Sequence, residues 1–106
     1  MDWINLEDYS QIEQALEDSK PFLIFKHSTR CSISSMAKNR FERNFDLDDV
    51  KVFYLDLIKY RSISNQLASD FNVPHESPQV MYINEGRCFY HASHGGIDVN
   101  DLKASI

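Results

Sequence analysis

Residues 22–34 read FLIFKHSTRCSIS, and this stretch decides the fold. It opens with a continuous apolar run typical of a buried strand, and the residues from 32 onward have helical spacing. Cys31 therefore stands at a strand-to-helix turn, where backbone N–H groups lack partners and the helix dipole is positive. Both features favour the thiolate, the nucleophilic form of cysteine, and Arg30 adds a permanent positive charge beside it. The alternative is a small buried residue, since a free cysteine is usually part of an inert core.

The rest of the chain alternates helices and strands around this stretch. Apolar spacing and turn residues predict helices over 9–18, 32–44, 63–71 and 98–106, and strands over 22–25, 50–58, 79–83 and 87–94. The first two strands are joined by a helix and should be parallel, whereas the last two form a hairpin around residues 84–86. The predicted fold class is α/β, with a central mixed four-stranded sheet flanked by helices and an extra N-terminal helix.

Length and composition exclude several broad classes of protein. The 106 residues fit a single domain, 1–106. A net charge of −5 argues against general nucleic-acid binding, which needs a basic face. No apolar run approaches the roughly 20 residues of a membrane span, and the acidic N-terminus lacks the basic start of a signal peptide. We therefore expect a cytoplasmic protein that binds neither nucleic acid nor membrane.

The chain has two cysteines, Cys31 and Cys88, which lie far apart in the sequence. In a cytosolic protein this favours free thiols over a disulfide framework. Cys88 comes just after the predicted hairpin turn, at the opposite end of the sheet from Cys31. We therefore expect Cys88 to be a core or half-buried strand residue and not a resolving cysteine.

The order of elements and the position of Cys31 resemble the thioredoxin superfamily over almost the full chain. The phrase KHSTRCSIS at 26–34, followed by Ser77-Pro78-Gln79, resembles one branch more closely, the monothiol bacilliredoxins. The resemblance implies a thiol-disulfide oxidoreductase that uses bacillithiol, a small thiol built from cysteine, glucosamine and malate. Such a protein removes bacillithiol from mixed disulfides on client proteins, with Cys31 as the nucleophile.

Three positions depart from the pattern of a two-cysteine thioredoxin. Ser34 stands where the resolving cysteine would be, Phe25 where a buried acid is common, and Arg30 where a tryptophan usually precedes the nucleophile. A two-cysteine cycle is therefore not expected, and a second thiol must regenerate Cys31.

The residues around Cys31 admit both functional and structural interpretations. Ser34 lies one helical turn later, so its hydroxyl is placed to donate a hydrogen bond to the sulfur; the alternative is a solvated residue of the first turn. Arg30 would stabilise the thiolate or meet a carboxylate of the small thiol, unless it is simply an exposed arginine without a partner. Lys26 and His27 are interpreted as surface residues at the end of a strand.

Two later segments are candidate binding sites by resemblance. The superfamily keeps a cis-proline facing the active thiol, which implies a cis bond before Pro78 and a free backbone at Ser77 for an extended substrate. The alternative is a trans-proline that starts an edge-like strand. Gly95, Gly96 and Asp98 resemble the Gly-Gly-x-Asp segment with which glutaredoxins hold glutathione, where N–H groups suit a carboxylate and the aspartate suits an ammonium. The alternative is a flexible turn followed by an ordinary N-cap.

The sequence thus predicts a monothiol oxidoreductase with bacillithiol as co-substrate and no bound cofactor or metal. Its expected partners are bacillithiol and bacillithiolated client proteins, and a monomer is expected. Two other functions remain open. Resemblance to some monothiol glutaredoxins allows an iron–sulfur carrier, which would need further thiolates. A non-catalytic stress protein that uses the same fold to bind a partner is the second.

Overall fold

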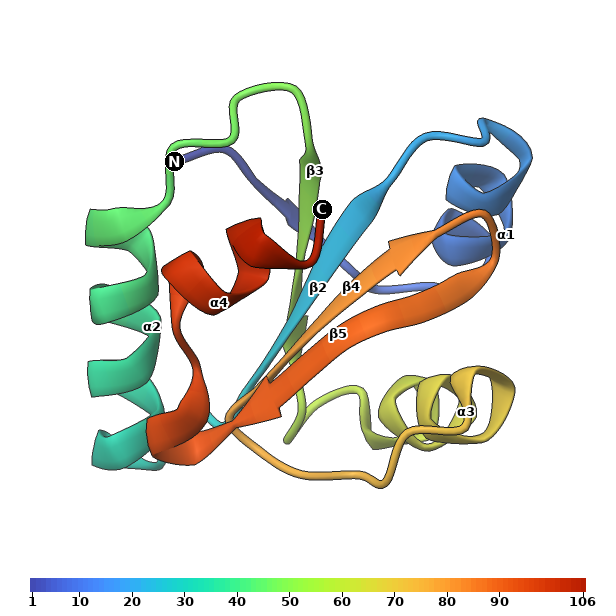
Figure 1. The fold of residues 1–106 in the computed structure, drawn as a ribbon. Coiled ribbons are helices and arrows are strands. Elements are labelled where there is room, and N and C mark those ends of the chain that lie inside the picture. Colours follow the sequence, from blue (N-terminus) through green and yellow to red (C-terminus); the bar gives the residue numbers. More distant parts are fainter.

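The computed structural model describes residues 1–106, which form five strands, four α-helices and one short 3₁₀-helix (Figure 1). The elements follow in the order β1 (Trp3–Asn5), α1 (Ser10–Glu17), β2 (Phe22–His27), α2 (Ser32–Asn44), β3 (Lys51–Asp56), α3 (Arg61–Phe71), β4 (Gln79–Asn84), β5 (Arg87–Ser93), η1 (His94–Gly96) and α4 (Val99–Ala104). None of the helices is long and apolar enough to cross a membrane.

The strands form one mixed sheet in the order β1-β3-β2-β4-β5. Strands β1, β3 and β2 are parallel, and β4 and β5 each run antiparallel to the preceding neighbour in that order. The predicted fold class is confirmed, but the sheet has five strands where the sequence predicted four. The additional strand β1 has only three residues, which is too short to show the alternation that identifies a strand. It is held by pairing with β3, from Trp3 opposite Val52 to Asn5 opposite Tyr54.

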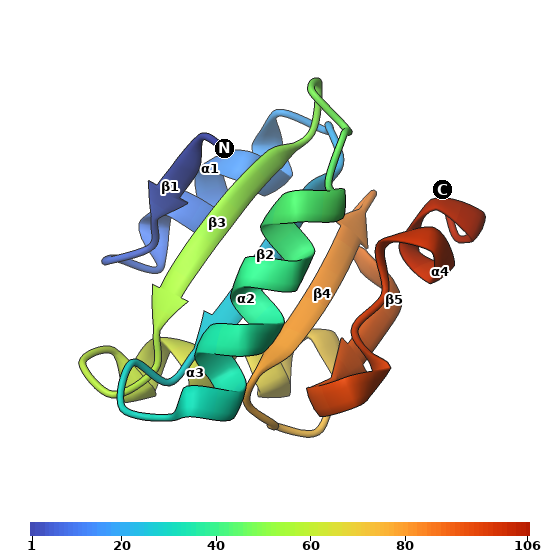
Figure 2. The ribbon, with the colours of Figure 1, turned by 90° about the vertical axis from the view of Figure 1, so that its left-hand side faces the viewer.

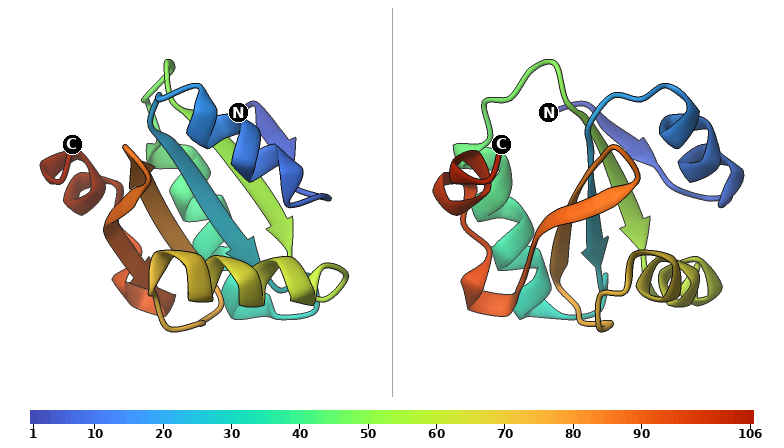
Figure 3. Two further views of the ribbon diagram at one scale, coloured as in Figure 1. Left: turned by 90° about the vertical axis from the view of Figure 1, so that its right-hand side faces the viewer. Right: turned by 45° about the vertical axis from the view of Figure 1, so that its right-hand side comes forward.

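Helices cover both faces of the sheet, α1 and α3 on one face and α2 and α4 on the other (Figures 1 and 3). Because β2 lies in the middle, all six of its residues are buried, and alternate side chains enter opposite cores. Phe22 and Ile24 join the core beneath α1 and α3, whereas Leu23 and Phe25 join the core beneath α2 and α4.

One edge of the sheet brings together the segments that the sequence analysis singled out. The parallel strands β2 and β3 end there at His27 and Asp56, and the antiparallel strand β4 begins there at Gln79. Helices α2 and α3 both start at this edge, and β5 returns to it at Ser93 opposite Gln79. We call this edge the active end, and the edge with the β4–β5 hairpin the hairpin end. Figure 2 shows α2 lying across the sheet, with β1 and β3 on one side and β4, β5 and α4 on the other.

Candidate functional site

Cys31 is the N-cap residue of α2 at the active end. Its backbone is extended, its carbonyl oxygen accepts the hydrogen bond of the Ser35 N–H at 3.1 Å, and its own N–H donates to the carbonyl of Ser28 at 3.1 Å. The thiol is free and partly exposed. The side chain therefore stands beside the unpaired N–H groups and the positive end of a 13-residue helix. Arg30, immediately before it, is exposed.

Ser34 fastens the loop before Cys31 to the end of β2. Its hydroxyl is fully buried, accepts a hydrogen bond from the Ser28 N–H at 3.1 Å and lies 2.7 Å from Nδ1 of His27. Since burial and the nearby charge of Lys38 lower the pKa of His27, the ring is neutral near pH 7, and Nδ1 can accept a hydrogen bond from the Ser34 hydroxyl. The expected alternative of a solvated first-turn residue is wrong, because the Ser34 hydroxyl is buried. The expected hydrogen bond from this hydroxyl to the Cys31 sulfur is not among those it forms, which are with His27 and Ser28.

Lys26 and His27 are buried, so their interpretation as surface residues is wrong. The physical reason is that β2 is the central strand and both of its faces are covered by helices. Lys26 Nζ lies 3.4 Å from the carbonyl oxygen of Ser64 and 3.5 Å from Nδ1 of His75, without a carboxylate partner. Burial, with a smaller contribution from the positive charge of Arg61, lowers the pKa of Lys26 to about 8.

The Ser77–Pro78 peptide bond is cis, and Pro78 is buried at the start of β4. The carbonyl oxygen of Pro78 accepts a hydrogen bond from the His94 N–H at 3.0 Å, which ties the end of β5 to this proline. The hydroxyl oxygen of Ser77 is buried and has no hydrogen-bond partner in the protein.

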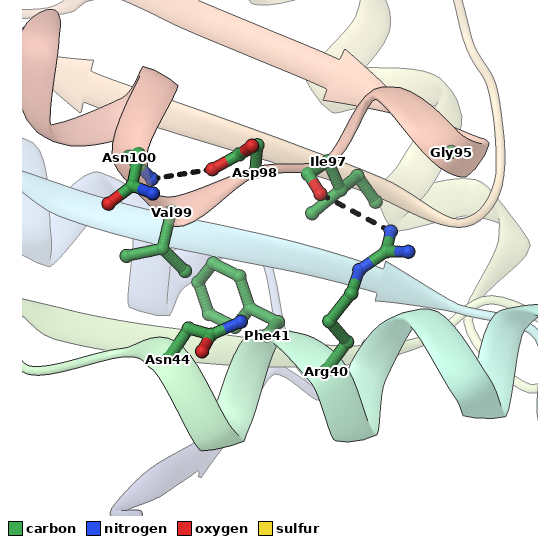
Figure 4. Close-up of a pocket in the computed structure, with 8 residues that line it drawn as sticks. All are labelled: Arg40, Phe41, Asn44, Gly95, Ile97, Asp98, Val99 and Asn100. Atoms are coloured by element: carbon green, nitrogen blue, oxygen red, sulfur yellow. Dashed lines mark hydrogen bonds between the residues drawn. The ribbon is translucent and has the colours of Figure 1, made fainter.

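Gly95 and Asp98 line a groove of about 330 Å³ between α2 and the segment that joins β5 to α4 (Figure 4). We call this the Arg40 groove, because Arg40 enters it from α2 and donates to the carbonyl oxygen of Ile97 at 3.3 Å. The Asp98 carboxylate accepts from the Asn100 N–H at 2.7 Å and so caps α4. Gly96 is exposed beside Gly95 but does not line this groove.

A second groove, of about 370 Å³, lies on the other side of α2 and was not predicted from the sequence. We call it the Trp3 groove; its seven lining residues are Trp3, Asn5, His27, Ser35, Lys38, Asn39 and Tyr54. Three of them come from β1 and β3, so the groove could not be assembled without the unpredicted strand β1. The spacing of Ser35, Lys38 and Asn39 after Cys31 was the available signal, because these positions share one helical face with Cys31.

The buried polar side chains of the protein gather at the active end. They are Lys26, His27, Ser34, Ser64 and Gln79. No group of three or more His, Cys, Asp or Glu side chains is arranged to hold a metal ion.

Comparison with known proteins identifies the family. The family model of the monothiol bacilliredoxin BrxC matches residues 4–102. A solved structure described as a candidate oxidoreductase with a thioredoxin fold is 34% identical, with a TM-score of 0.86 over 97% of this chain and 92% of that chain.

More distant thioredoxins share the fold alone. A mutant thioredoxin from Halobacterium salinarum is 18% identical, with a TM-score of 0.71 over 96% of this chain and 85% of that chain. The thioredoxin of Malassezia sympodialis is 19% identical, with a TM-score of 0.75 over 97% of this chain and 88% of that chain. The chain therefore belongs to the monothiol bacilliredoxin BrxC family and is a thiol-disulfide oxidoreductase with a thioredoxin fold.

Proposed function

We propose that this bacilliredoxin uses bacillithiol as its co-substrate and removes it from mixed disulfides on client proteins through the thiolate of Cys31. One observation carries the proposal: a partly exposed thiol caps the start of α2, and the position one turn later holds Ser34, not a second cysteine. The helix start favours the anionic sulfur that attacks disulfides.

The proposed exchange proceeds by two substitutions at sulfur. The Cys31 thiolate attacks the bacillithiol sulfur of the mixed disulfide, a new disulfide forms between Cys31 and bacillithiol, and the client leaves as a thiolate that takes a proton from water. A second small thiol then attacks the bacillithiol sulfur in the same way and releases the Cys31 thiolate. No internal disulfide forms in this cycle, because Ser34 supplies no sulfur.

Arg30 and residues of two later segments are proposed to bind the reactants. The backbone of Ser77 next to cis-Pro78 would pair with an extended segment of the client. The hydroxyl of Ser77 has no hydrogen-bond partner in the protein, so it would be available to bond with the client as well. The exposed guanidinium of Arg30 would meet a carboxylate or the developing thiolate. The resemblance to glutaredoxins suggested Gly95, Gly96 and Asp98 for the small thiol, but the Asp98 carboxylate already caps α4, so the grooves on the two sides of α2 have to be compared.

The cellular setting is also part of the proposal. Two free cysteines suit a reducing compartment, and we propose a cytoplasmic monomer that needs no bound cofactor.

The proposal is tested with a model client whose single cysteine carries bacillithiol. Purified protein should release the client thiol and acquire the bacillithiol mass on Cys31. The Cys88→Ser variant should do the same, whereas Cys31→Ser should leave the client modified. Release of the client thiol by Cys31→Ser at the wild-type rate would contradict the proposal.

A further inference from the structure

We propose that the Trp3 groove binds the glucosamine and malate portions of bacillithiol while its sulfur is bonded to Cys31. This inference rests on the proposed function and adds to it the surface that recognises the co-substrate. Two grooves flank α2, and the inference favours the Trp3 groove over the Arg40 groove, which contains Gly95 and Asp98.

The Trp3 groove lies along the helical face that Cys31 begins. Ser35, Lys38 and Asn39 follow Cys31 by four, seven and eight residues, which places them on one side of the helix. The Ser35 N–H donates a hydrogen bond to the Cys31 carbonyl, so Cys31 lies directly before the first turn of the helix, on the same side as Ser35. At 1.5 Å per residue, Asn39 lies roughly 12 Å along the axis from Cys31. A molecule of three linked components attached to the Cys31 sulfur spans such a distance.

The lining of the Trp3 groove matches the chemistry of a sugar joined to a dicarboxylate. The ammonium of Lys38 is paired with Glu42 and lies 5.0 Å from the Trp3 ring centre and 5.5 Å from that of Tyr54. The two aromatic rings and Glu42 hold this ammonium in place. Because an ammonium has three N–H donors, Lys38 can still donate a hydrogen bond to a malate carboxylate. The exposed amides of Asn5 and Asn39 supply both donors and acceptors for sugar hydroxyls.

The two grooves differ in their relation to the proposed client surface. Strand order puts β1 and β3 on the side of β2 opposite to β4, so the Trp3 groove and Pro78 lie on opposite sides of α2 (Figure 2). The Arg40 groove lies on the same side as Pro78, whose carbonyl is bonded to His94 at the start of the segment that lines the groove. Use of the Trp3 groove lets client and small thiol approach Cys31 without competing for space.

Two polar side chains of the Arg40 groove already hold parts of the fold together. The Arg40 guanidinium is directed to the Ile97 carbonyl, and the Asp98 carboxylate is directed to the Asn100 N–H (Figure 4).

The test compares two disulfides that deliver different groups to the same sulfur. Oxidised bacillithiol and cystine each react with the Cys31 thiolate to give one mixed disulfide and one released thiolate, which is protonated by water. The ratio of the two rate constants isolates recognition of the sugar and malate. Lys38→Gln and Asn39→Ala should each lower this ratio about tenfold, since each removes a hydrogen-bonding partner of the ligand. Arg40→Gln and Asn44→Ala are the matched variants in the Arg40 groove and should keep the wild-type ratio.

Intrinsic fluorescence gives an independent readout, because Trp3 is the only tryptophan in the chain. The bacillithiol adduct of Cys31 should change the Trp3 emission, whereas the cysteine adduct should not. Asn39 is exposed, so Asn39→Ala is expected to fold even if Lys38→Gln does not. Thermal unfolding of each variant checks this point.

The outcomes separate this inference from the proposed function. If wild-type protein forms no adduct with oxidised bacillithiol, the proposed function fails. If the adduct forms but the rate ratio survives both Lys38→Gln and Asn39→Ala, the inference is overturned and the proposed function stands. A ratio that falls in Arg40→Gln would place the ligand in the other groove and would also overturn the inference.

Discussion

The two ends of the central sheet contain one cysteine each and differ in almost every other respect. At the active end, Cys31 is partly exposed at a helix start, and every fully buried polar side chain of the protein lies nearby. At the hairpin end, Cys88 pairs in register with Ile83, packs against the apolar core and donates its S–H to the Tyr90 carbonyl at 3.3 Å. Burial raises the pKa of the Cys88 thiol.

The two cysteines are the same residue type in different surroundings, and we propose that their positions in the fold set the reactivity of each thiol. Cys31 stands at the start of α2, where its sulfur makes no capping hydrogen bond, whereas the S–H of Cys88 in β5 donates to a backbone carbonyl. Buried polar groups reduce stability unless they are well paired, so their concentration at one end is consistent with stability given up for function. The predictions below test this difference between the ends.

The largest expected effect is the loss of exchange on removal of the Cys31 sulfur. Cys31→Ser should lower the rate of client release by at least about a hundredfold, because a serine hydroxyl does not ionise near neutral pH. Cys88→Ser should stay within about twofold of wild type, since its thiol is mostly protonated at pH 7. Stopped-flow measurement of the client thiol gives both rates. Equal losses in the two variants would remove the proposed difference between the ends.

The second prediction concerns the buried charge at Lys26. Its pKa is lowered to about 8 by burial, so the folded protein binds fewer protons than the unfolded chain between pH 8 and about 10.5. Below pH 8 the cost of burying the charge is present in full and amounts to roughly 3 kcal/mol. Lys26→Met should therefore raise the free energy of unfolding by up to that amount at pH 7.

The lowered pKa of Lys26 also determines how the stability gained by Lys26→Met depends on pH. As pH rises from 8 to 10.5, wild-type Lys26 loses its proton in the folded state and the advantage of Lys26→Met should disappear. Urea unfolding at several pH values measures the difference. A gain that stays constant across this range would show that it does not come from the buried charge.

The third prediction restores a sulfur one turn after Cys31. Ser34→Cys should form a disulfide with Cys31 under mild oxidation, because residues at i and i+3 of a helix start can bring their sulfurs together. In its reduced form the variant should be about 1–2 kcal/mol less stable, since it loses strong hydrogen bonds to His27 and Ser28. Peptide mapping and denaturant unfolding test the two parts. Absence of a 31–34 disulfide would contradict the geometry of the turn.

The smallest effect is expected at the hairpin end. Cys88→Ala removes one partly buried sulfur that packs at the margin of the core, which should cost about 1 kcal/mol or less. Thermal unfolding measures this change. A loss as large as that of a central core residue would show that the sulfur is more tightly packed than its position indicates.

Sequence patterns were sufficient for most of the fold. The apolar run ending before Cys31 and the helix over 32–44 fixed the strand-to-helix turn, and resemblance supplied the cis bond before Pro78. Periodicity was less informative about burial. Ile33 and Met36 have the helical spacing of the core residues Ala37 and Phe41, yet both are exposed, because the sheet covers only one side of α2.

The site itself was predicted less completely, for two physical reasons. The burial of Lys26 and His27 depends on which strand is central, and this is a property of the whole sheet that a local pattern does not contain. The Trp3 groove depends on pairing between β1 and β3, which joins residues about fifty positions apart. Three residues without alternation gave no signal for that pairing.

The most direct measurement mixes the reduced protein with oxidised bacillithiol and determines its intact mass, followed by peptide mapping. The protein should gain one bacillithiol, which should reside on Cys31 and be removed by a reducing thiol. Attachment to Cys88, or a disulfide between Cys31 and Cys88 within one folded molecule, would contradict this prediction.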